Sequence, residues 1–249
     1  MKKLLAALLF VPLVAWGAEE GYKLDRAPQL IDDQAALQSG AKLFVNYCLN
    51  CHSASSMRYS RLADLGLTED QIKKNLLFTS DKVGDLMRVA MTTKDAKDWF
   101  GAAPPDLSVI SRAKSSEHGS GADYVYSYLR TYYRDDTRPT GWNNLAYPNS
   151  AMPHVLWQMQ GTRVPVYVDK KDEAGKAVHE FEKFEEVTPG TMTPLQYDQA
   201  VGNITAFLSW MSEPAQETRK RIGVWVLLFL GVLTVFTWRL NASYWKDVK

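Results

Sequence analysis

The residues with the clearest chemistry are two cysteines and a histidine in the run Cys48-Leu49-Asn50-Cys51-His52. Two thiols three positions apart, with a histidine directly after the second, match the attachment pattern of c-type haem. Thioether bonds to the two vinyl groups of one porphyrin need both sulfurs within one short turn. The next residue then places its imidazole beneath the ring as the proximal iron ligand. The spacing therefore predicts one covalently attached haem c, with His52 as its first axial ligand.

Three other roles for this cysteine pair find less support in the sequence. A zinc site needs four ligands, and beyond the two cysteines it would have to use His118, His154 or His179. A thioredoxin-like redox pair is expected beside a βαβ pattern, which this chain does not show. A plain disulfide would leave the adjacent histidine without a purpose. Haem attachment accounts for all three residues of the motif.

A haem that carries electrons usually has a sixth ligand, and a methionine thioether raises its reduction potential. Two methionines, Met152 and Met192, fall in predicted loops. Met192 directly precedes the last helix of the body, where a small cytochrome c would place its ligand. Met152 is braced by Pro148 and Pro153. The residues alone leave these two open, with His154 as a third candidate that would give bis-histidine ligation.

The charge distribution indicates which partners suit the body of the protein. The chain has 29 basic and 28 acidic residues, but eight of the basic residues and only Asp247 among the acids lie outside 19–218. The middle therefore holds 21 basic and 27 acidic residues, a net charge of −6. An acidic body repels nucleic acid and attracts basic partners at long range. The chain has no cysteine beyond the motif, so no further disulfide is expected.

The two ends of the chain predict export and membrane anchoring. Residues 1–17 have Lys2 and Lys3 ahead of an apolar run, as in a signal peptide, and the predicted cleavage follows Gly17. Residues 222–238 carry no charge, and at about 1.5 Å per residue they reach roughly 25 Å, a short membrane span. We therefore expect a signal peptide (1–17), a periplasmic haem domain (18–218), a transmembrane anchor (219–239) and a cytoplasmic tail (240–249).

The elements that must position the haem residues are predicted to be mainly helices. A helix over 32–47, begun by Asp32 or Asp33, would carry the cysteine motif at its end. Gly40 within it would either let another backbone pass close by or be a glycine that the helix simply tolerates. A tyrosine-rich core helix over 123–134 would lie beside the cofactor. Further helices are expected over 68–77 with a Thr68–Gln71 capping box, over 81–92, and over 193–214 with Thr193, Pro194 and Gln196 at its start.

Other segments read as a hairpin and as loops. Alternating apolar residues over 163–187, around Asp172-Glu173-Ala174-Gly175, predict a β-hairpin, whereas 134–144 and 147–154 are predicted loops. The run Pro104-Pro105-Asp106-Leu107-Ser108 predicts a rigid loop whose aspartate begins the next helix. Beside a haem, a proline carbonyl in this loop, such as that of Pro105, can accept the second N–H of the proximal histidine and fix its tautomer.

The order of motifs resembles the cytochrome c1 family, the membrane-anchored haem subunits of the quinol–cytochrome c oxidoreductase, in its proteobacterial form. The resemblance covers nearly the whole chain and rests on Cys48–His52 followed by Arg58-Tyr59, on Pro104-Pro105-Asp106-Leu107-Ser108, on the 134–144 loop, on Ala151-Met152-Pro153, on Phe207-Leu208-Ser209-Trp210 with Glu213-Pro214, and on Arg219-Lys220-Arg221 before a single span. Together with the helical patterns it implies a mainly α fold: a cytochrome c-like haem domain with a small β-hairpin insertion and one C-terminal transmembrane helix.

The resemblance also implies site residues that the spacing leaves open. In that family the distal methionine belongs to the middle loop, which corresponds to Met152, and the segment of Met192 supplies no ligand. The family commonly has an arginine near a haem propionate. Lys114 stands at that position here, with Arg112 two residues earlier, so either side chain is a candidate partner of the propionate.

The function implied by the resemblance is a one-electron relay in the respiratory chain of a bacterial inner membrane. A Rieske-type iron–sulfur subunit would reduce the haem, a cytochrome b subunit would belong to the same complex, and a soluble cytochrome c would accept the electron. No substrate bond would be made or broken on this chain. One alternative is a membrane-anchored cytochrome c that feeds a terminal oxidase. Another is a haem-based sensor with an open sixth site.

Overall fold

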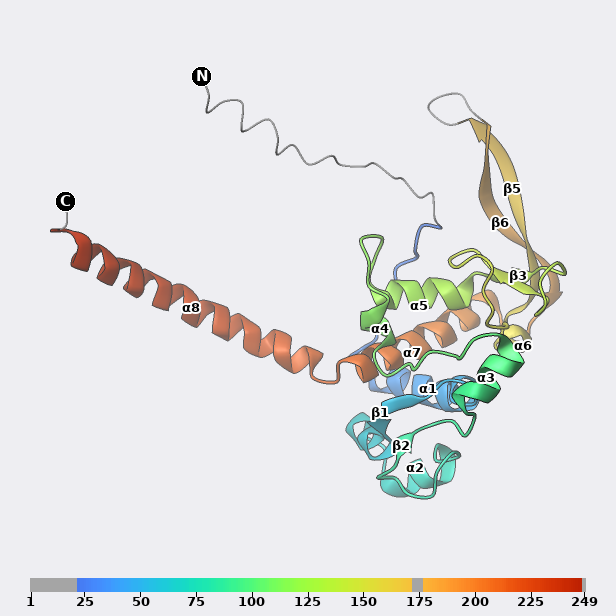
Figure 1. Cartoon of the computed structure of the whole chain (residues 1–249), viewed down its shortest axis with the longest axis horizontal. Coiled ribbons are helices and arrows are strands. Elements are labelled where there is room, and N and C mark those ends of the chain that lie inside the picture. The colour runs from blue at the N-terminus through green and yellow to red at the C-terminus, as the bar shows by residue number, and fades with distance from the viewer. Residues whose placement is uncertain (1–21, 172–176, 248–249) are drawn as a thin grey trace.

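The computed structural model describes residues 22–171 and 177–247, which form a helical body, a projecting β-hairpin and a long C-terminal helix (Figure 1). The helices are α1 (Gln34–Leu43), the π-helical turn η2 (Phe44–Cys48), the 3-10 helix η3 (Tyr59–Leu65), α2 (Glu69–Asn75), α3 (Thr93–Phe100), α4 (Ile110–Ala113), α5 (Gly121–Arg130), α6 (Trp157–Gln160), α7 (Pro194–Ser212) and α8 (Gln216–Trp245). The strands are β1 (Ala54–Arg58), β2 (Leu86–Met87), β3 (Tyr132–Arg134), β4 (Trp142–Asn144), β5 (Gly161–Lys171) and β6 (Ala177–Pro189). The predicted mainly α fold with a small hairpin and a C-terminal anchor helix is confirmed.

The centre of the body is the packing of α1 against α7 (Figure 1). Asp33 begins α1, because its carboxylate accepts a hydrogen bond from a backbone N–H of the first turn at 3.0 Å. A Cβ placed on Gly40 would lie 2.1 Å from the Asn203 carbonyl oxygen, so glycine lets the two backbones approach closely. Farther along, the buried rings of Phe44 and Phe207 are 5.5 Å apart. The close helix packing predicted at Gly40 is confirmed.

Both predicted capping boxes are present. At the start of α7, the Thr193 side chain accepts a hydrogen bond from the Gln196 backbone, the Gln196 side chain accepts one from the Thr193 backbone, and Pro194 occupies the first turn. Thr68 and Gln71 form the same reciprocal pair at the start of α2. These local hydrogen bonds satisfy backbone donors that have no partner inside the helix.

The strands of the described chain form three two-stranded antiparallel sheets, β1 with β2, β3 with β4 and β5 with β6. The β5–β6 hairpin is the predicted insertion, and it projects from the body (Figure 1). Its predicted turn over 172–175 lies outside the described residues. The hairpin is joined to the body at its base, where the Arg163 side chain donates to the Tyr132 carbonyl oxygen at 3.0 Å.

The helix predicted over 81–92 is wrong. This segment contains β2 instead, in which the fully buried Met87 pairs with Ala54 of β1. Before it, the Asp85 carboxylate accepts hydrogen bonds from the Ser80 hydroxyl at 2.6 Å and from the Lys82 backbone at 3.2 Å. These bonds close a turn over 80–85, at the start of the segment predicted to be helical.

The tyrosine-rich helix is shorter than predicted, and the loop predicted over 134–144 contains a strand. α5 ends at Arg130, and the next residues leave it to form β3, which pairs with β4. The helix ends early because the next residues pack against other segments as a strand. Tyr132 is fully buried and its neighbour Tyr133 is half-buried, which is the alternation expected in a strand. Buried Asn143 and Asn144 hold the loop through side-chain hydrogen bonds.

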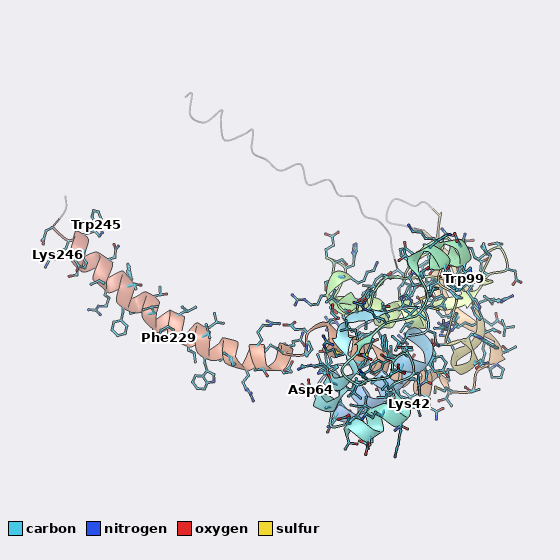
Figure 2. All side chains as sticks on the ribbon, turned by 60° about the horizontal axis from the view of Figure 1, so that its bottom comes forward. Lys42, Asp64, Trp99, Phe229, Trp245 and Lys246 are labelled. Atoms are coloured by element: carbon cyan, nitrogen blue, oxygen red, sulfur yellow. The ribbon has the colours of Figure 1, made fainter. Side chains whose placement is uncertain are left out.

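α8 has 30 residues and contains the predicted span 222–238. Its most apolar window has a mean hydropathy of 1.9, and none of this window is buried against the body. Figure 2 shows the side chains of Phe229 and Trp245 pointing away from the helix, with no second element beside them. By length and composition, α8 is able to cross a membrane. The predicted signal peptide, 1–17, lies outside the described residues.

Candidate haem site

The cysteine motif lies in a tight turn at the end of α1. Here the helix widens into η2, where the Leu49 backbone bonds to the Phe44 carbonyl oxygen at 3.0 Å, five residues back. The backbones of Cys51 and His52 then both bond to the Cys48 carbonyl oxygen, at 3.1 and 2.8 Å. Two thiols and one imidazole therefore project from a single turn, as attachment to one porphyrin requires.

The chemical state of the two cysteines fits covalent attachment. Both thiols are free, Cys48 buried and Cys51 half-buried. Burial, with a smaller contribution from Cys51, raises the pKa of the Cys48 thiol to about 12. A thiol with so high a pKa is a poor candidate for a reactive redox pair, which needs a low-pKa thiolate.

His52 is oriented by one strong contact. Its Nδ1 lies 2.7 Å from the Pro105 carbonyl oxygen, and because a carbonyl only accepts, Nδ1 carries the proton and donates it. The other nitrogen, Nε2, is thereby left with a lone pair for a metal. Burial lowers the pKa of His52, although the Pro105 hydrogen bond and the charge of Asp106 act in the opposite direction. The lowered pKa favours the neutral imidazole, which is the form that binds iron.

The loop that carries Pro105 is bonded to the strand after the motif. The Leu107 backbone donates to the Ser53 carbonyl oxygen at 2.8 Å, and the Asp106 carboxylate accepts from the Ser55 backbone and hydroxyl at 2.8 and 2.6 Å. The prediction that Asp106 caps the next helix is wrong. α4 begins only at Ile110, and the carboxylate instead joins two segments fifty residues apart.

The loop of Met152 is held by tyrosines. The Tyr132 hydroxyl donates to the Met152 carbonyl oxygen at 3.1 Å, and the Tyr128 hydroxyl lies 2.7 Å from that of Tyr132 and 2.6 Å from the Ser150 hydroxyl. Burial raises the pKa of Tyr132, so this hydroxyl keeps its proton and remains a donor. Met152 itself is half-buried. Sequence reasoning placed a tyrosine cluster near the cofactor but missed its contact with this loop.

The other two candidate ligands, Met192 and His154, lie in surroundings that differ from those of Met152. Met192 packs against the apolar core, and its backbone donates to the Met159 carbonyl oxygen at 3.2 Å. His154 is 2% exposed and stacks on Tyr132 with 4.7 Å between ring centres. Its ring makes no hydrogen bond of good geometry among the described residues, although Gln160 lies beside it. Burial lowers the pKa of His154 to about 3, which keeps the ring neutral.

The two candidate partners of a propionate lie on different sides of α4. The Lys114 ammonium lies over the Tyr124 and Tyr147 rings, 5.0 and 5.8 Å from their centres, and Tyr124 stacks on Tyr128. Lys114 is therefore continuous with the tyrosines that hold the Met152 loop. Arg112 instead lines a cavity formed with α7 and the start of α8.

The sequence matches the Cytochrome C1 family over residues 31–248. The chain belongs to the cytochrome c1 family. It is 45% identical to a cytochrome c1 of Allochromatium vinosum, with full coverage of both chains. It is 43% identical to a Nitrosomonas europaea protein named ammonia monooxygenase gamma subunit, over all of this chain and 98% of the other. A cytochrome c1 of Rhodospirillum rubrum is 31% identical over 87% of this chain and 83% of its own length.

As a member of the cytochrome c1 family, the chain is a membrane-anchored c-type cytochrome that relays single electrons within the quinol–cytochrome c oxidoreductase of a respiratory chain. The family belongs to a complex that also contains cytochrome b and Rieske proteins. One covalently attached haem c supplies the iron that changes between two oxidation states. The residues of the site fit this group, because the free thiols and the unprotonated Nε2 of one imidazole stand in a single turn.

Proposed function

We propose that this cytochrome c1 takes electrons from the Rieske-type iron–sulfur subunit of a complex with cytochrome b and passes them to a soluble cytochrome c. Cys48 and Cys51 would hold the haem by thioether bonds, and His52 and Met152 would bind its iron. The observation that carries the proposal is the 2.7 Å contact between His52 Nδ1 and the Pro105 carbonyl oxygen. It fixes the tautomer and the plane of the ring, as expected for a proximal histidine.

The protein residues keep this site in one geometry while the electron comes and goes. The Pro105 carbonyl prevents rotation of the His52 ring, and the Tyr132 hydroxyl restrains the backbone of Met152. Fixed ligands in a dry surrounding reduce the rearrangement that accompanies each change of charge. No substrate bond is made or broken on this chain.

The ligand assignment is tested by Met152→Ala, with Met192→Ala as the matched control. Optical spectra of the oxidised and reduced holoproteins are compared, together with carbon monoxide binding to the reduced forms. We expect Met152→Ala to lose the weak near-infrared methionine–iron band and to bind carbon monoxide, whereas Met192→Ala keeps the band. The reverse pattern would assign the iron to Met192. No c-type haem in the wild-type protein would remove the basis of the proposal.

Lys114, rather than Arg112, is proposed as the partner of a haem propionate. The support is its position over Tyr124 and beside the tyrosines of the Met152 loop. A nearby cation stabilises the reduced haem, which carries one positive charge less. Lys114→Gln should therefore lower the midpoint potential more than Arg112→Gln does, measured by redox titration. A larger shift for Arg112→Gln would reverse this assignment.

We also propose the orientation of the chain in a bacterial inner membrane. After removal of residues 1–17, the haem domain (18–218) lies in the periplasm, 219–239 cross the membrane once, and 240–249 are cytoplasmic. The exposed apolar surface of α8 and the predicted signal peptide support this arrangement. Protease added to intact spheroplasts should release the haem domain, whereas an epitope after Lys249 should be cut only after lysis. Cleavage of the epitope in intact spheroplasts would invert the orientation.

One comparison favours a second assembly, because the Nitrosomonas europaea relative bears the name of an ammonia monooxygenase subunit. The same haem site would then serve an oxygenase, and a terminal oxidase is the corresponding alternative from the sequence. Affinity purification of the tagged chain from gently solubilised membranes separates these cases. The proposed function requires cytochrome b and an iron–sulfur protein in the purified complex. Recovery of oxygenase or oxidase subunits in their place would favour the second assembly.

A further inference from the structure

A cavity of about 370 Å³ lies where the body meets α8. Its walls come from the segment before α1, from the region around α4 and α5, from the C-terminal half of α7 and from the first turns of α8. Its polar lining includes six hydroxyl side chains, two cations and one carboxylate: Ser111, Ser115, Ser120, Thr205, Ser209, Ser212, Arg112, Lys220 and Glu213. The haem residues do not line it.

Two buried hydroxyls point to a polar ligand in this cavity. Thr205 and Ser212 are 1% and 8% exposed, and neither hydroxyl has a hydrogen-bond partner among the described residues. They lie seven residues apart on α7, on the same face of the helix, and both line the cavity. Because buried hydroxyls are nearly always hydrogen-bonded, unpartnered ones at a cavity indicate a polar ligand. At about 1.5 Å per residue the two positions are about 10 Å apart along α7, so the ligand must carry more than one accepting group.

The charge at the cavity indicates that this group is an anion. Glu213 is paired with Arg219, and Lys220 is paired with Glu217 at 2.7 Å. Arg112 makes no side-chain hydrogen bond or ion pair within residues 22–171 and 177–247. Its charge acts on the Glu213 carboxylate across the cavity, but Glu213 takes its hydrogen bond from Arg219, so the guanidinium donors of Arg112 remain available to a ligand. A guanidinium group binds phosphate oxygens with two parallel hydrogen bonds.

The position of the cavity along α8 matches the headgroup layer of a bilayer. Gln216 and Lys220 line it, and the charge-free run begins at Ile222. At about 1.5 Å per residue, Lys220 and Gln216 lie roughly 3 and 9 Å before the first residue of that run. The polar layer of a leaflet is about 5 to 8 Å thick, so a headgroup can reach this depth.

We propose that this cavity binds the phosphodiester headgroup of an anionic phospholipid. Arg112 would contact the phosphate oxygens, and the hydroxyls of Thr205 and Ser212 would donate to separate oxygens of the same lipid, in its headgroup and its glycerol ester region. The lipid would then fix the angle between α8 and the haem domain. The cavity is separate from the haem residues. If the lipid proposal fails its test, the assignment of the haem residues is therefore unchanged.

The test measures lipid retained by the full-length holoprotein. The protein is reconstituted into vesicles of phosphatidylcholine and phosphatidylglycerol, extracted in mild detergent and examined by native mass spectrometry. Arg112→Gln should weaken phosphatidylglycerol binding about tenfold, the scale of one lost charge-assisted hydrogen bond. Arg221→Gln is the control, because it removes an equal charge next to the lining residue Lys220 from a residue that does not line the cavity. The Thr205→Val and Ser212→Ala double variant should also bind less.

Three outcomes would overturn the proposal. Equal retention by wild type and Arg112→Gln would show that Arg112 holds no headgroup. Displacement of phosphatidylglycerol by an equal concentration of inorganic phosphate would assign the cavity to a free anion. A loss of the cytochrome b subunit from membranes of the Arg112→Gln strain, with lipid retention unchanged, would make the cavity a subunit contact.

Discussion

At the scale of single residues, the support of the Met152 loop rests on Tyr132. Its fully buried ring stacks on His154, and its hydroxyl reaches the Met152 carbonyl oxygen. Tyr132→Phe keeps the ring and removes the hydroxyl, which leaves a carbonyl and the Tyr128 hydroxyl without this partner. We expect the free energy of unfolding to fall by about 1 to 2 kcal/mol, measured by denaturant titration of the holoprotein.

Tyr147→Phe is the matched control for this prediction. The side chain of Tyr147 is 52% exposed, and its ring also lies beside Tyr128. Removal of an exposed hydroxyl should change the free energy of unfolding by less than about 0.5 kcal/mol. An equal loss in the two variants would show that the bond to Met152 contributes no stability.

The hydrogen bonds of the Asp106 carboxylate predict that the stability of the protein decreases in acid. Burial raises the pKa of this carboxyl, but hydrogen bonds from Ser108 and Ser55 outweigh it and lower the pKa below its usual value. A lowered folded pKa stabilises the protein above the unfolded value of about 3.9, and this stability is lost as the pH falls through the folded pKa. Asp106→Asn should therefore be less stable than wild type at pH 7, and the two should converge in acid.

The measurement is the midpoint of thermal unfolding of both proteins between neutral and acid pH. Asp81→Asn changes an exposed carboxylate of a neighbouring loop and serves as the control. A difference between wild type and Asp106→Asn that stays constant into acid would contradict the role of the ionised carboxylate.

At the scale of elements, the contact between α1 and α7 depends on Gly40. In an isolated helix, alanine is more favourable than glycine by about 1 kcal/mol. Here the added methyl group would meet the Asn203 carbonyl oxygen at 2.1 Å and the Phe207 side chain at 2.7 Å, so the two helices would have to move apart. Gly40→Ala should lower the free energy of unfolding by about 1 to 3 kcal/mol, measured by denaturant titration.

Gly84→Ala provides the comparison, because a Cβ at Gly84 would meet no atom within 4 Å. Its effect should be small and of either sign. Should Gly40→Ala prove as stable as wild type, the close approach of the helices would be relaxed by movements the structure does not contain.

At the scale of the whole molecule, the distribution of charge predicts how an acceptor approaches. The net charge of −6 over 19–218 should attract the proposed acceptor, a basic soluble cytochrome c, before contact. Salt shortens the range of this attraction, from about 10 Å at 0.1 M to about 3 Å at 1 M. The second-order rate of electron transfer should fall steeply as ionic strength rises, measured by stopped-flow absorbance.

An acidic cytochrome c serves as the control acceptor, whose rate should rise or stay level with salt. A rate to the basic acceptor that is independent of ionic strength would rule out electrostatic steering. In that case the contact surface itself, and not the field of the body, would select the partner.

Features that depend on a few neighbouring residues could be predicted without the structure. The spacing of Cys48, Cys51 and His52 predicted the haem turn, the Thr68 and Thr193 boxes predicted two helix starts, and the apolar run predicted α8. These features were predictable because their hydrogen bonds or periodicity lie within one turn or one helix.

The contacts between distant segments became known from the folded structure. It joined Asp106 to Ser55 instead of the next helix, and it turned Tyr132 from a helix into a strand so that its hydroxyl reaches Met152. It also separated Arg112 from Lys114. Helical spacing and a capping residue describe the local chain, whereas burial of a side chain against segments 20 or 50 residues away can outweigh that local preference.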